Sequence, residues 1–79
     1  MLQLEILSPS EKIYEGEALS VIFPGEVGSF GVLPNHAPII SVLKQGKIEW
    51  TSPSNKKESI EIKGGVVEVL NNRVSVLVK

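Results

Sequence analysis

The chain has 79 residues, a formal net charge of −1 and 42% hydrophobic residues, which is typical of one small globular domain. Its charged residues are scattered, so it lacks the basic face that nucleic-acid binding requires. It contains no cysteine, which excludes a disulfide framework and a thiolate metal site. Its apolar runs are too short to cross a membrane, and its first residues lack the features of a signal peptide. We therefore expect a single domain over residues 1–79 without direct membrane insertion.

Apolar and polar residues alternate along most of the chain, with the period of a β-strand that buries one face. No window keeps apolar residues at helical spacing over three turns. In chain order, the apolar sets expected to face inward are Leu2, Leu4 and Ile6; Leu19, Val21 and Phe23; Ile48 and Trp50; Ile60 and Ile62; and Val74, Val76 and Val78. The pattern predicts an all-β fold, a flattened antiparallel β-sandwich or barrel of about eight to ten short strands.

Turn-forming residues separate these strands. Proline, glycine, serine and asparagine gather at residues 8–10, 24–25, 45–46 and 52–55. Asn71 and Asn72 stand between two apolar runs, and both residue types tolerate positive φ, which predicts a tight hairpin there. The polar segment 51–58 predicts an exposed hairpin loop with Lys56 and Lys57 at or near its tip.

The segment 23–38 has the most unusual composition in the chain. Its sixteen residues hold three glycines, three prolines and the only histidine, His36. Glycine adopts positive φ without steric cost and proline fixes φ, so this mixture predicts a defined backbone path rather than a flexible linker. Asparagine is one of the residues that visit the left-handed region most readily, which makes Asn35 a candidate for positive φ.

His36 invites a catalytic role because histidine titrates near neutral pH, yet the sequence offers it no partner. The chain has no cysteine and no aspartate, and its serines lie mostly in turns, so no nucleophile, base and orienting group can be assigned. A single histidine with scattered glutamates does not predict a metal site. The glycines at 25, 28 and 31 lack the Lys-Ser/Thr pair and the helix of a phosphate-binding loop. We expect no catalytic residue, no metal and no cofactor.

Four segments of the chain, in the same order, match one known family. They are Leu-Glu-Ile-Leu-Ser-Pro at 4–9, Tyr-Glu-Gly at 14–16, Gly-Ser-Phe-Gly-Val-Leu-Pro-Asn-His-Ala-Pro at 28–38, and Gly-Gly-Val-Val-Glu-Val at 64–69 followed by Val-Ser-Val-Leu at 74–77. In these segments the chain resembles the epsilon subunit of F-type ATP synthases, whose mitochondrial counterpart is called delta. The resemblance covers nearly the whole chain. It implies the N-terminal β-sandwich domain of that subunit, without the C-terminal helical hairpin that most of the family carries.

The resemblance implies a non-catalytic subunit of the central stalk, or rotor, in a hetero-oligomeric complex. Such a subunit fastens the gamma subunit to the c-ring and supports the coupling of proton translocation to ATP synthesis. The resemblance also implies a location peripheral to the cytoplasmic face of a bacterial inner membrane, reached through the complex.

The resemblance assigns two sets of site residues. It implies a gamma-subunit interface at Ser8, Asn35, His36, Ala37 and Pro38, in which the 35–37 turn and Ser8 form one patch. It implies a loop facing the c-ring at Glu26, Val27, Gly28, Ser29 and Phe30. The family often has acidic residues on both sides of the middle glycine, where this chain has Val27 and Ser29.

Two alternatives from other functional classes stay open. A free-standing β-sandwich or OB-like module that binds a peptide or small ligand would account for the composition and the strands, but not for four ordered motifs. A small enzyme that uses His36 would need partner groups that the sequence does not supply.

Overall fold

The computed structural model describes all residues 1–79, which form nine β-strands and no helix. The strands are β1 (Leu2–Leu7), β2 (Lys12–Ala18), β3 (Ser20–Gly25), β4 (Gly28–Val32), β5 (Ile39–Leu43), β6 (Gly46–Thr51), β7 (Lys57–Ile62), β8 (Gly65–Leu70) and β9 (Arg73–Val78). The all-β fold that the alternation predicts is confirmed, and no helix able to cross a membrane is present.

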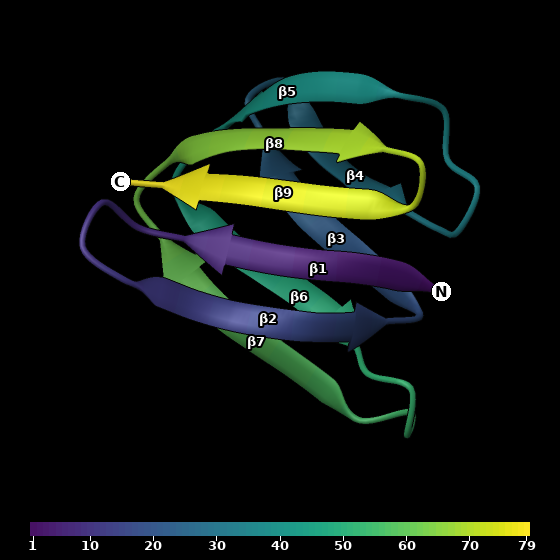
Figure 1. Ribbon diagram of the computed structural model, residues 1–79. Helices are drawn as coiled ribbons and strands as arrows, with labels where there is room; N and C mark the ends of the chain where they lie inside the picture. Colours follow the sequence, from purple (N-terminus) through teal and green to yellow (C-terminus); the bar gives the residue numbers. More distant parts are fainter.

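One continuous sheet, in the order β2-β1-β9-β8-β5-β3-β6-β7 with β4 paired to β3, folds over on itself into two layers. In Figure 1, β2, β1, β9, β8 and β5 lie in front of β4, β3, β6 and β7. The layers join at one corner, where β3 and β5 pair only through Gly25 and Leu43. Glycine is required at this corner because a Cβ on Gly25 would lie 2.5 Å from the backbone O of Gly28 and 2.8 Å from the Phe30 ring.

All strand pairs but one are antiparallel. The exception is β1 and β9, which run parallel with Gln3 opposite Arg73 and Leu7 opposite Leu77. The hairpins β1–β2 and β8–β9 take their antiparallel direction from short turns, whereas β1 and β9 meet from opposite ends of the chain. No turn dictates the direction of that pair. The sheet, which the sequence predicts to be antiparallel, therefore contains one parallel pair.

The register sorts the loops into two ends of the molecule. The first end holds Met1, the β4–β5 loop at 33–38, the β6–β7 loop at 52–56 and the β8–β9 turn at 71–72. The second end holds the β1–β2 turn at 8–11, the β3–β4 turn at 26–27, the turns at 44–45 and 63–64, and Lys79. In Figure 1 the N-terminus lies at the right, on the first end, and the C-terminus lies at the left, on the second.

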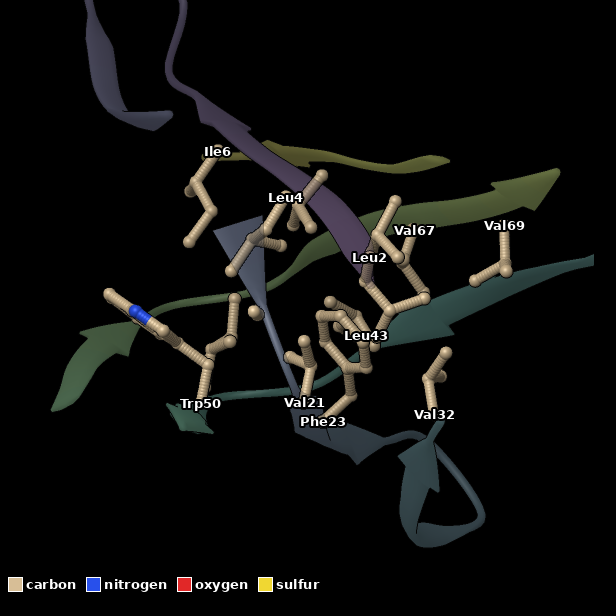
Figure 2. Close-up of a cluster of buried hydrophobic side chains, with 14 of the residues drawn as sticks. Leu2, Leu4, Ile6, Val21, Phe23, Val32, Leu43, Trp50, Val67 and Val69 are labelled. Atoms are coloured by element: carbon tan, nitrogen blue, oxygen red, sulfur yellow. The ribbon is translucent and has the colours of Figure 1, made fainter. Parts of the chain in front are cut away.

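A single apolar core of 16 buried residues lies between the layers, and no polar or charged residue is buried in it. Figure 2 shows Leu2, Leu4 and Ile6 of β1 extending from one layer toward Val21 and Phe23 of β3 in the other. The predicted inward sets are buried as expected in β1, β6 and β9.

Leu19 is predicted by the alternation to face inward, and this prediction is wrong. It is only partly buried, because it lies between β2 and β3, where its N–H donates to Thr51 O at 2.7 Å. Ala18, which the alternation leaves out, is fully buried instead.

The core assignment predicts different costs for the same small deletion at two isoleucines. Ile48 in β6 is fully buried, whereas Ile40 in β5 is 72% exposed. We expect Ile48→Val to lower the free energy of unfolding by about 1 kcal/mol, because it removes a methylene from a closely packed core. Ile40→Val should change it by less than about 0.5 kcal/mol. Urea denaturation measures both, and equal losses would contradict this core.

Candidate functional site

The β4–β5 loop, residues 33–38, holds four of the predicted gamma-interface residues in a tight turn. Asn35 adopts φ 68°, so the positive φ expected there is confirmed. The His36 N–H donates to Leu33 O at 3.2 Å, which closes the turn. The half-buried His36 ring places Nδ1 2.7 Å from Ala37 O. A carbonyl can only accept, so Nδ1 carries the proton and Nε2 of the neutral ring is an acceptor.

The β8–β9 turn lies beside this loop. Asn71 and Asn72 have φ 50° and 63°, which confirms the predicted tight hairpin. The Asn35 N–H donates to Asn72 Oδ1 at 2.6 Å, and Asn72 Nδ2 donates to Asn35 Oδ1 at 3.4 Å. A polar hollow of about 340 Å³ lies here, lined by Asn35, His36, Pro38, Asn71 and Asn72. Asn72 is a site residue that sequence reasoning missed, because nothing local links positions 37 residues apart.

Ser8 lies at the other end of β1 from the β4–β5 loop, residues 33–38, which we call the histidine loop. The Gln3 N–H donates to Asn72 O, so the histidine loop lies near the start of β1, and Ser8 follows the last residue of that strand. The extended chain between Gln3 and Ser8 spans roughly 17 Å. The Ser8 hydroxyl is instead engaged in its own turn, where it donates to Glu11 O at 3.2 Å. The structure therefore separates Ser8 from the 35–38 loop. The residues that the sequence predicts to form one patch lie at opposite ends of β1.

The loop predicted to face the c-ring lies at the second end of the molecule, as Ser8 does. Glu26 and Val27 form the β3–β4 turn, and Val27 is fully exposed at its tip. Gly28 follows with φ 140°, a conformation that other L-residues rarely adopt. Phe30 differs from the other four residues of this set, because its ring packs on Phe23 with a centroid distance of 5.5 Å. Glu26, Val27, Gly28 and Ser29 are exposed, whereas Phe30 joins the edge of the core.

Lys12 lies in β2, just after the turn that holds Ser8. Its Nζ lies 2.8 Å from Glu15 Oε1 and 3.6 Å from Glu5 Oε2. The hydrogen bond to Glu15, with the charges of both carboxylates, raises the pKa of Lys12 above its ordinary value. The pair is exposed and screened by solvent, so it adds little to stability. No group of three or more His, Cys, Asp or Glu residues could hold a metal ion.

The layer formed by β2, β1, β9, β8 and β5 carries a row of apolar side chains on its outer face, which we call the exposed row. Val42, Val66, Leu77 and Leu7 stand directly opposite one another on β5, β8, β9 and β1. Directly paired residues point to the same face of a sheet, so the four side chains form one line across four strands, roughly 15 Å long. Val42, Val66 and Leu77 are 49%, 41% and 59% exposed, and Leu7 at the end of the row is half-buried. This exposed row lies near the second end of the face, close to Ser8, and the rest of the same face extends toward the histidine loop.

Comparison with known proteins decides the family. A family model described as the β-sandwich domain of the ATP synthase delta/epsilon chain matches residues 1–79. The chain belongs to this family. The ATP synthase epsilon chain of a Nitratiruptor species is 51% identical over 78 residues, and that of Sulfurimonas denitrificans is 50% identical over 78 residues. Each alignment covers 99% of this chain and 60% of the relative, so the chain spans about 60% of the length of these epsilon chains.

Two solved structures share the fold. A chain in the Euglena gracilis mitochondrial ATP synthase superposes with a TM-score of 0.92 at 23% identity, covering 98% of this chain and 49% of that one. A chain in the central stalk and c-ring structure of the Tetrahymena thermophila mitochondrial ATP synthase gives 0.80 at 14% identity, covering 98% and 62%. Family membership accounts for the four ordered motifs, which the alternative of an unrelated ligand-binding module left unexplained.

Two glycines of the epsilon-family motif make a matched pair for mutation. Gly28 has positive φ, whereas Gly31 does not, and a Cβ on Gly31 would meet no atom closer than 3.9 Å. We expect Gly28→Ala to lower the free energy of unfolding by about 1–3 kcal/mol, through backbone strain at the turn. Gly31→Ala should change it by less than about 0.5 kcal/mol. Chemical denaturation of both variants tests this, and a loss confined to Gly31→Ala would show that the turn has another shape.

Proposed function

We propose that this chain is a non-catalytic rotor subunit of an F-type ATP synthase, which fastens the gamma subunit to the c-ring. In that role it supports the coupling of proton translocation to ATP synthesis. The chain itself is peripheral to the cytoplasmic face of a bacterial inner membrane, which it reaches through the ATP synthase complex. Support comes from family membership and from 50–51% identity to bacterial ATP synthase epsilon chains. A mechanical joint needs rigidity and contact area rather than reactive groups, and a small sandwich with shaped turns at both ends suits that demand.

The gamma subunit covers the outer face of β1, β9, β8 and β5 in this proposal. A single partner that contacts both Ser8 and His36 has to extend along this face, because the two residues lie at opposite ends of it. The observation that carries the proposal is the exposed row. A partner that covers these aliphatic side chains removes them from water, which lowers the free energy and favours binding.

The size of the domain fits the same conclusion. A stable interface buries about 800 Å² on each partner, which is about a sixth of the 4969 Å² that this chain exposes. The domain measures 27 × 24 × 18 Å, so an interface of this size takes up a whole broad face of the domain rather than one loop.

The β3–β4 turn faces the c-ring in this proposal. Val27 at its tip is fully exposed, and Glu26 is the one carboxylate of the turn. An exposed ion pair contributes only about 0–1 kcal/mol, so the contact depends more on Val27 packing and on backbone hydrogen bonds than on Glu26.

Two matched substitutions test the gamma-binding face. Leu77 lies in the exposed row, and Ile22, 46% exposed in β3, lies in the other layer. We expect Leu77→Lys to weaken gamma binding at least about tenfold, because it brings a charge into a dry contact. Ile22→Lys should stay within about twofold of the unmodified chain. The measurement is co-expression with gamma and the c-ring, followed by titration of purified gamma.

Each outcome of this titration decides something. If Ile22→Lys weakens binding and Leu77→Lys does not, gamma covers the other layer. If the unmodified chain does not co-purify with gamma and the c-ring at all, the proposed function is wrong.

Cysteine cross-linking tests the two ends separately. The chain has no native cysteine, so a single introduced cysteine is unique. We expect Ser8→Cys and His36→Cys to cross-link to gamma, and Val27→Cys to the c-ring. Lys56→Cys, in the exposed β6–β7 loop, is the control and should cross-link to neither. If Lys56→Cys reaches gamma while positions 8 and 36 do not, the proposed orientation is wrong.

A further inference from the structure

We propose that Asn72 is a positioning residue that holds the histidine loop in its binding conformation. Residues 33–38 are exposed for most of their length and make no strand pairing. The hydrogen bonds that tie this loop to another segment are the two between Asn35 and Asn72. The β8–β9 turn therefore fixes a loop from the other half of the sequence.

The side chain of Asn72 does more than its turn requires. A two-residue hairpin of this kind needs positive φ at both positions, which glycine also supplies. Asn71 has φ 50° and meets that need without a side-chain hydrogen bond. Asn72 meets it with φ 63°, and its backbone O accepts from the Gln3 N–H at 2.8 Å. The side-chain amide of Asn72 is thus free to bind Asn35, while its backbone O holds the hairpin against β1.

Fixing Asn35 also fixes the histidine that follows it. The His36 N–H closes the turn onto Leu33 O, and the ring Nδ1–H is directed to Ala37 O. This arrangement leaves Nε2 of the neutral ring as an acceptor, so it suits a partner group that donates a hydrogen bond. A loop held in this way loses less conformational freedom on binding than a mobile one. That last consequence rests on the proposed contact between this loop and gamma.

Three variants separate the side chain of Asn72 from the turn. Asn72→Gly keeps the positive φ and the backbone O that binds Gln3, but removes the contact to Asn35. Asn72→Asp keeps an oxygen that can accept from the Asn35 N–H. Asn71→Gly is the matched control at the neighbouring position, which also has positive φ. Amide exchange of Asn35, measured by NMR on the isolated chain, reports the contact, and amide exchange of Gln3 reports the integrity of the hairpin.

We expect Asn72→Gly to speed exchange of the Asn35 backbone amide roughly three- to tenfold, because this N–H loses its one hydrogen bond. Exchange of the Gln3 amide should not change. Asn72→Asp should restore most of the protection, and Asn71→Gly should leave it unchanged. Ring ¹⁵N shifts of neutral His36 should show the Nδ1–H tautomer in the unmodified chain and in Asn71→Gly, with Nε2–H increasing in Asn72→Gly.

The inference is overturned if Asn35 exchange is unchanged in Asn72→Gly. It is equally overturned if Gln3 exchange rises by the same factor, since the substitution would then only have opened the hairpin. These measurements do not involve gamma, so they stand apart from the proposed function. If Asn72→Gly loosens the loop but gamma affinity stays the same, the positioning role holds and the assignment of the histidine loop to the gamma interface fails.

Discussion

The packing of the two layers against each other is the interaction on which the rest of the structure depends. The core between them contains no polar residue, and the chain has no disulfide, so burial of apolar side chains has to offset the conformational entropy of the chain. Each fully buried side chain such as Phe23, Leu4 or Ile48 contributes about 1.5–3 kcal/mol. Strand pairing joins the two layers only at the Gly25–Leu43 corner, so packing of side chains rather than strand hydrogen bonds holds most of the sandwich closed.

This core also explains where function can lie. A strand that gives one face to the core has every second residue left on the outside. On β5, β8 and β9 some of these outer positions are aliphatic, and the register aligns Val42, Val66 and Leu77 in one row. The histidine loop at one end of this outer face and the β1–β2 turn at the other have fixed conformations. A rigid scaffold with a row of aliphatic side chains on one outer face and fixed turns suits a joint between larger proteins.

The candidate site was partly predictable from sequence. The positive φ at Asn35 and the tight hairpin at Asn71 and Asn72 follow from local residue chemistry, and both are present. The separation of Ser8 from the histidine loop was not predictable, because it depends on which end of β1 meets the β8–β9 turn. The contact between Asn35 and Asn72 was hidden for the same reason, since the two residues are 37 positions apart.

By itself, the sequence determined the strand content, the positions of most turns and which residues face inward, because these depend on a period of two residues and on local φ preferences. The order of its four motifs also indicated the family. Only the tertiary structure decided that β1 and β9 pair in parallel, that the β1–β2 and β3–β4 turns share one end, and that four aliphatic residues align across the outer face. Those features arise from pairing between segments far apart in the chain, where no local preference of a residue sets the partner, the direction or the register.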